Sequence, residues 1–129
     1  MQGNVGLGRA IAYFTTIGCP IMLPLNDTQK YDLVVDIDGR LFKVQVKTSG
    51  NLKTSGNYEV ALKNTGGSSG VSKTRHFDNT SCDLLFVLLA DETMLLVPTA
   101  EIESKSTWNV TQDRREKYTV EFYSGRATR

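Results

Sequence analysis

The sequence has few of the residues from which metal-binding or disulfide-bonded domains are built. Among 129 residues there are two cysteines, Cys19 and Cys82, and one histidine, His76. Because a structural zinc site takes four ligands, mostly from Cys and His, a site of that kind is excluded. Two widely separated cysteines fit no disulfide framework, and we expect both to be buried thiols.

Long apolar runs are also absent. The longest, Leu84–Ala90, has seven residues, whereas a membrane-spanning helix needs about 20. The N-terminus shows no basic leader followed by an apolar block, which predicts an intracellular bacterial, phage or organellar protein that is not secreted. A hydrophobic share of 40% indicates one globular domain over residues 1–129.

The sequence has no large excess of positive or negative charge, since 15 Lys and Arg and 14 Asp and Glu leave a net charge of +1. A partner of opposite charge must therefore be argued from local patches. Between residues 40 and 76 the balance is +6, because Glu59 is the one acid. The seven basic residues of this stretch are Arg40, Lys43, Lys47, Lys53, Lys63, Lys73 and Arg75. They predict phosphate contacts, with a solvated surface as the alternative.

The pattern of apolar residues predicts a mixed α/β domain around a central sheet. Residues 4–17 form an amphipathic helix, with Leu7, Ala10 and Phe14 on its apolar face. Residues 49–56 and 64–76 are polar loops. The remaining predicted elements are an extended segment at Cys19–Leu25, strands at Tyr31–Ile37, Leu41–Thr48, Tyr58–Lys63, Asp83–Ala90, Met94–Pro98 and Tyr118–Tyr123, and a short helix capped by Thr99 at Thr99–Glu103.

The dipeptide Asp38-Gly39 predicts a tight hairpin between the first two of these strands. Its register makes the positions of opposite residues sum to 77, so one face is apolar and looks into the core. On the other face Asp32 lies opposite Gln45, and Lys47 is two residues further along.

Asp32, Gln45 and Lys47 offer a carboxylate, an amide oxygen and an ammonium in one cluster. Hard oxygen donors suit Mg²⁺, and a bound metal ion can activate water for attack on a phosphodiester. The nearby lysine can act on that water or on developing charge. The alternative is that this face is only the solvated side of a sheet.

These residues resemble the core of the PD-(D/E)xK nuclease superfamily. The segments that carry the resemblance are Tyr31–Asp36, the Asp-Gly turn and Val44–Thr48. The Gln-x-Lys form is similar to the homing endonucleases associated with group I introns, and the archaeal-type Holliday junction resolvases share this core. The match covers roughly residues 3–103 and leaves 104–129 as a C-terminal extension.

The resemblance implies a restriction-endonuclease-like fold, with a central mixed sheet and flanking helices, and a Mg²⁺-dependent DNA endonuclease, with Mn²⁺ able to substitute. Asp32 and Gln45 would hold the metal, and Lys47 would be catalytic. The alternatives are a branched-DNA resolvase and a nuclease-derived module that binds DNA without cleaving it. The residues expected to contact double-stranded DNA are Lys43, Lys53, Lys63, Lys73 and Arg75.

One position departs from the family pattern. Members carry a glutamate just after the second glycine of the opening helix, where this sequence has Leu7. The site therefore binds one metal, recruits Asp36 or Glu59 as an additional acid, or is weakened in cleavage. Because a double-strand break needs two sites, we also expect a two-fold homo-oligomer, a dimer or a tetramer. Trp108 and Tyr118–Tyr123 are its candidate interface, or simply cover the sheet.

Overall fold

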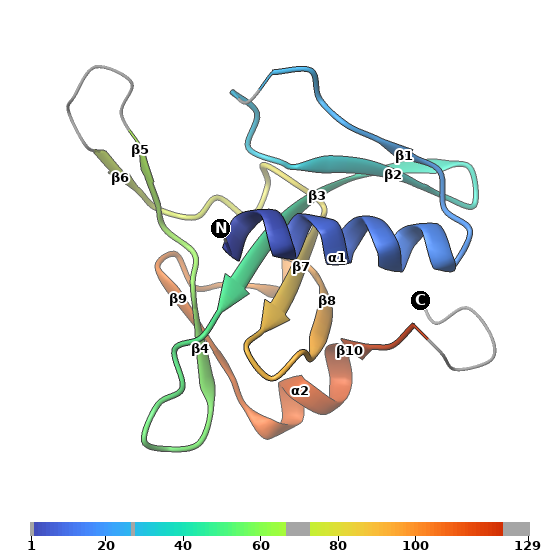
Figure 1. The fold of residues 1–129 in the computed structure, drawn as a ribbon. Coiled ribbons are helices and arrows are strands. Elements are labelled where there is room, and N and C mark those ends of the chain that lie inside the picture. The colour runs from blue at the N-terminus through green and yellow to red at the C-terminus, as the bar shows by residue number, and fades with distance from the viewer. Residues whose placement is uncertain (1, 27, 67–72, 123–129) are drawn as a thin grey trace.

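The computed structural model describes residues 2–26, 28–66 and 73–122 (Figure 1). Of the predicted loop 64–76, residues 67–72 lie outside the described residues, as does Tyr123 of the last predicted strand. The elements in chain order are α1 (Gln2–Thr16), β1 (Ile21–Met22), β2 (Leu33–Ile37), β3 (Arg40–Ser49), β4 (Tyr58–Ala61), β5 (Asn64–Gly66), β6 (Lys73–Arg75), β7 (Leu84–Leu89), β8 (Met94–Pro98), the 3-10 helix η1 (Thr99–Glu101), β9 (Thr107–Val110), α2 (Gln112–Tyr118) and β10 (Thr119–Val120).

The central element is a six-stranded mixed sheet, which confirms the predicted fold class. Its strand order is β1-β2-β3-β7-β8-β10. All neighbours are antiparallel except β3 and β7, which run parallel. Two further pairs, β4 with β9 and β5 with β6, form separate two-stranded ribbons. In Figure 1, α1 crosses one face of the sheet, and the β5–β6 ribbon extends away from it.

The hairpin between β2 and β3 has the predicted register. Leu33 pairs with Val44, and the pairs continue in step to the Asp38-Gly39 turn. Both turn residues have positive φ, 54° and 88°, as a tight turn between twisted strands requires. The pairs Leu33–Val44 and Val35–Phe42 therefore share one face, as the sequence predicts, and Lys43 and Asp36 point to the other, together with Val34 and Leu41.

Helix α1 covers the apolar face of the hairpin. Tyr13 and Phe14 are fully buried in one core cluster with Val44 of β3 and Phe86 of β7. The helix approaches β3 closely at Gly6, where an added Cβ would lie 2.7 Å from the Thr48 methyl carbon. A residue without a side chain is needed at this contact.

A second core cluster lies on the opposite face of the sheet, over β7 and β8. Leu85, Val87 and Leu89 point to this side, whereas Phe86 and Leu88 of the same strand point toward α1. Strand β7 is thus buried on both faces, as its unbroken apolar sequence predicts. The second cluster is closed by residues of β4, β9 and their flanking segments, namely Val60, Leu62, Phe77, Ile102, Trp108 and Val110.

Burial corrects the prediction for Trp108. Trp108 is 2% exposed, and the centroid of its ring lies 6.0 Å from the centroid of the Tyr118 ring. Trp108 therefore packs over the sheet, and its candidate role in an interface between subunits is wrong. The other sequence reading, that these aromatics cover the sheet, is confirmed for Trp108.

The last third of the chain differs most from its prediction. Residues 112–118 form α2, where the sequence predicts only the start of a strand at Tyr118. The N-cap Thr111 accepts a hydrogen bond from the Arg114 amide. The strand is reduced to Thr119–Val120. Helix α2 has no buried residue, so it lacks the apolar periodicity that would reveal it. Thr99 caps no helix either, because its hydroxyl donates to the Cys82 carbonyl.

The loop 49–56 is folded rather than irregular. Leu52 forms a β-bridge with Tyr58. The Lys53 amide donates to the Asn57 carbonyl, and the Lys53 carbonyl accepts from the Gly56 amide. This short hairpin connects β3 to β4. In the described part of the chain, no helix has the length and apolar character needed to cross a membrane.

Candidate active site

Asp32 lies directly before β2, where the regular pairing with β3 ends. Its amide donates to the Val44 carbonyl at 2.8 Å, and its Oδ2 accepts from the Val46 amide at 2.7 Å. The carboxylate thus takes the place of a strand carbonyl. The last backbone pair between β2 and β3 is Leu33 with Val44. Asp32 and Gln45 therefore do not form the cross-strand pair that the sequence predicts, and Asp32 contacts β3 through its side chain instead.

Gln45 and Lys47 lie on the face of β3 that points away from α1. Gln45 is 8% exposed and Lys47 is half-buried. Burial lowers the pKa of the Lys47 ammonium below its ordinary value, while the charges of Asp32 and Cys82 act in the opposite direction. A carboxylate, a carboxamide and a desolvated amine are therefore brought together at the start of β2, as the sequence predicts.

Cys82 is a fourth member of this cluster, and sequence reasoning missed it. Its Sγ lies 3.9 Å from Oε1 of Gln45. Burial raises the pKa of the Cys82 thiol to about 11, with the Asp83 and Asp32 carboxylates adding to the shift. The thiol is therefore protonated at neutral pH. Cys19 and Cys82 are both buried and form no disulfide, which confirms the predicted thiols.

The two additional candidate acids have other contacts. Asp36 accepts a hydrogen bond from the Gly39 amide at 2.8 Å and so closes the hairpin turn. Glu59 accepts from Asn51 at 3.2 Å and pairs with Lys53 at 3.7 Å. These contacts tie both carboxylates to local turns.

A family model of PD-(D/E)XK endonucleases matches residues 1–124. The chain belongs to the PD-(D/E)XK endonuclease family. The match reaches past residue 103, so the segment that supplies β9, α2 and β10 is part of the family pattern. Membership supports nuclease activity on DNA.

The fold of this PD-(D/E)XK endonuclease is similar to that of a solved bacterial homing endonuclease, I-Ssp6803I. The TM-score is 0.74 at 26% sequence identity, and the similarity covers 91% of this chain and 85% of that one. No curated protein sequence matches the chain.

The donor set of the site fits Mg²⁺. Within residues 2–26, 28–66 and 73–122, no three His, Cys, Asp or Glu side chains gather in a way that could hold a metal ion. Asp32 and Gln45 instead offer one carboxylate and one amide oxygen. Mg²⁺ commonly takes one or two carboxylates and completes its shell with water and substrate phosphate.

Helix α1 contributes no acid to this set. Leu7 stands where the family carries a glutamate, and it packs against the core cluster under α1. The side chain at this position therefore contributes to the core and not to a metal site. The candidate site therefore lacks the helix carboxylate that the resemblance implies.

Three of the basic residues expected to contact DNA have described side chains. Lys43 is exposed, and its Nζ lies 5.6 Å from the centroid of the Tyr31 ring. Lys53 is 48% exposed and pairs with Glu59, and Lys63 is exposed. Lys73 and Arg75 lie on β6, in the ribbon that extends from the sheet.

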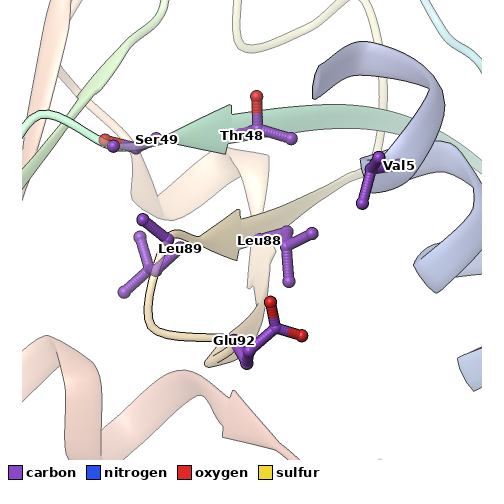
Figure 2. A pocket seen from close by; sticks show the side chains of 8 residues that line it. Val5, Thr48, Ser49, Leu88, Leu89 and Glu92 are labelled. Atoms are coloured by element: carbon purple, nitrogen blue, oxygen red, sulfur yellow. The ribbon is translucent and has the colours of Figure 1, made fainter. Parts of the chain in front are cut away.

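A cavity of about 330 Å³ lies at the carboxyl ends of β3 and β7, and the side chains of the cluster are not among the residues that line it. Figure 2 shows Thr48 and Leu88 on its strand walls, Val5 of α1 at its side and Glu92 on the β7–β8 turn. Glu92 is paired with Arg9. Because its walls are mainly apolar and its carboxylate is already paired, the cavity offers no set of groups for a phosphate.

Proposed function

We propose that the protein is a Mg²⁺-dependent endonuclease that hydrolyses phosphodiester bonds of double-stranded DNA. One observation carries the proposal: the Asp32 carboxylate is fixed by the Val46 amide, inside the Gln45-x-Lys47 triplet. Family membership supports the nuclease activity, and the hard oxygen donors support the choice of metal.

In this proposal Asp32 and Gln45 hold the ion through their side-chain oxygens. When bound, it supplies charge neutralisation at the phosphate and lowers the pKa of water. Lys47 acts beside it as a proton acceptor or as a donor to the phosphoryl oxygen. Because burial lowers its pKa, its ammonium gives up a proton more readily than an exposed lysine does.

DNA binding is assigned to the basic residues of the middle third. The β5–β6 ribbon supports this assignment, since a two-stranded antiparallel ribbon fits the major groove of B-DNA. Its register places Asn64 opposite Arg75 and Gly66 opposite Lys73, and Asn, Arg and Lys are residue types that bind phosphates and base edges. The likeness to I-Ssp6803I supports a site-specific homing endonuclease acting on intracellular DNA.

A double-strand break needs two active sites, so the working form is a homo-oligomer with two-fold symmetry. Exposed apolar side chains on β1 and β3 support an interface there: Met22 is 41% exposed and Leu41 58%. Their pairs with Val34 and Asp36 place them on one face of the sheet. Apolar side chains exposed on one sheet face can be covered by a second copy of the chain.

DNA binding without cleavage is the second function, and Leu7 favours it. Loss of the helix glutamate removes one carboxylate from the site, and a nuclease that has lost metal affinity would retain its DNA surface. This function predicts DNA binding that is independent of Mg²⁺ and no strand cleavage.

A plasmid-nicking assay decides between the two. We expect cleavage with Mg²⁺ or Mn²⁺, binding without turnover in Ca²⁺, and no cleavage in EDTA. Full activity in EDTA would refute the metal mechanism. Binding with no cleavage under any of these ions would establish the second function. Light scattering on the free protein and its DNA complex tests the oligomer, and a strictly monomeric particle would exclude it.

A further inference from the structure

Gln45 poses an orientation problem that a carboxylate at the same place would not. Its two terminal groups, C=O and NH₂, have nearly the same shape, and only the oxygen can coordinate a cation. With NH₂ turned into the site, the partial charge would repel a metal ion. Because Gln45 is 8% exposed, water is largely kept from it, and a protein group has to select the orientation.

Cys82 is placed to make that selection. Its Sγ lies 3.9 Å from Oε1 of Gln45, within the range of a weak S–H···O hydrogen bond. Gln45 and Lys47 point from one face of β3, and the Asp32 carboxylate is bound at the amide of Val46 between them. The oxygen that Cys82 contacts therefore belongs to this cluster. The second lone pair of that oxygen remains for another partner.

The backbone around Cys82 is held on both sides. Its carbonyl accepts from the Thr99 hydroxyl at 2.6 Å, and the Thr99 amide donates to the Asp83 carbonyl at 3.0 Å. Asp83 is bound twice to Lys43 of β3, through its amide to the Lys43 carbonyl and through Oδ2 from the Lys43 amide, both at 2.8 Å. The thiol is therefore fixed relative to the strand that carries Gln45.

We infer that Cys82 is a positioning residue whose S–H group directs the carbonyl oxygen of Gln45 toward the metal site. The inference rests on the proposed metal-binding role of Gln45. It predicts that removing the thiol weakens metal binding without altering the fold. The effect should be about three- to tenfold, below the 10- to 100-fold typical of stronger hydrogen bonds to metal ligands.

The test measures Mn²⁺ affinity by calorimetry on the intact chain without DNA. Cys82→Ala should lose affinity, and Cys82→Ser, which keeps a donor, should recover most of it. The decisive background is Gln45→Glu, since a carboxylate presents oxygen in either orientation. There Cys82→Ala should change the affinity by less than twofold. An equal loss in both backgrounds, or no loss in wild type, would overturn the inference.

A second readout needs no metal. The S–H stretching band of Cys82, assigned as the band that Cys82→Ala removes, should shift when Gln45→Leu takes away the acceptor. An unshifted band would overturn the inference whatever the metal data. If wild type neither binds Mn²⁺ nor cleaves DNA, the proposed function fails, and the band alone then decides whether Cys82 orients Gln45.

Discussion

The two faces of β3 differ in chemical character, because one carries core valines and the other carries the polar residues of the candidate site. Toward α1, Val44 is fully buried and Val46 packs against the same core cluster. On the other face, Gln45 and Lys47 alternate with these valines in sequence and lie near Asp32 and Cys82. Because successive side chains of a strand point to opposite faces, residues that stabilise the core alternate with residues of the candidate site.

This arrangement explains why a polar cluster can be tolerated beside the core. The cost of burying Lys47 and Gln45 falls on one face, while α1 stabilises the other through apolar burial. Substitutions on the two faces should therefore have opposite signatures. A change on the site face should affect cleavage more than folding, and a change under α1 should do the reverse.

The largest expected effect is on the site face. Lys47→Ala and Asp32→Ala should each reduce cleavage at least about 100-fold, because each removes a group with a direct chemical role. Asp32→Ala also removes the hydrogen bond from the Val46 amide, at a cost of about 1 kcal/mol. Nicking rates and urea unfolding curves measure the two effects.

Asp36→Ala is the matched control for Asp32→Ala. Both carboxylates belong to the β2 region, and both accept a backbone hydrogen bond. Asp36 closes the turn, so its loss should lower stability by a similar amount and leave cleavage within about threefold. If Asp36→Ala abolished cleavage as well, Asp36 would be the additional acid that the absence of a helix glutamate calls for.

The second-largest expected effect is a loss of stability when a core residue under α1 is truncated. Val44→Ala should lower the free energy of unfolding by about 2–4 kcal/mol, since it opens a cavity at a fully buried position. Lys43→Ala, at an exposed position of the same strand on the other face, should change it by less than about 0.5 kcal/mol. Equal losses in the two variants would contradict the assignment of faces.

The hairpin could be predicted from the sequence because its determinants are local. Asp38-Gly39 fixes the turn, and alternation in the flanking residues fixes the register. The buried strand Leu84–Leu89 could be predicted for the same reason, since a short unbroken apolar run is typical of a strand covered on both sides. Asp32, Gln45 and Lys47 meet because all three depend on this hairpin.

Other parts depend on contacts that no local pattern reveals. Helix α2 buries no residue, and it is held by its Thr111 cap and by Arg115, which donates to Asp91 and Thr93. Cys82 joins the site because β7 runs parallel to β3, across 37 residues of sequence. A lone cysteine at that distance carries no signal for such a contact.

The third prediction tests how closely α1 must approach β3. Gly6→Ala would place a Cβ 2.7 Å from Cγ2 of Thr48 and 3.0 Å from Cγ1 of Val46, and overpacking of this kind costs about 1–3 kcal/mol. Gly8→Ala is the control in the same helix. It has no atom within 4 Å of an added Cβ and should stabilise by about 0.5–1 kcal/mol.

Thermal unfolding of the two variants should therefore shift in opposite directions. The pair Gly6→Ala with Thr48→Ser, which removes the clashing methyl, should regain part of the loss. A Gly6→Ala variant as stable as Gly8→Ala would show that α1 can move away from β3 without cost.

The smallest effect concerns the cost of placing Lys47 on the site face. Because burial lowers the pKa of Lys47 from its ordinary 10.5, the unfolded chain binds more protons than the native one between the lowered pKa and 10.5. The free energy of unfolding contributed by this group therefore rises with pH through that window. Below the window the native protein bears the whole cost of the desolvated ammonium.

Lys47→Met removes this cost while keeping an unbranched stem, so it should stabilise the protein at pH 7. The gain should shrink as the pH rises through the window and vanish above 10.5. Urea unfolding of wild type and variant across this range measures it, and the alkaline titration of Cys82 largely cancels because both proteins contain that thiol. Lys43→Met, an exposed position on the same face, should give no such gain. If the increase in the free energy of unfolding stayed constant with pH, Lys47→Met would act through packing. Burial of the charged ammonium would then not destabilise the protein.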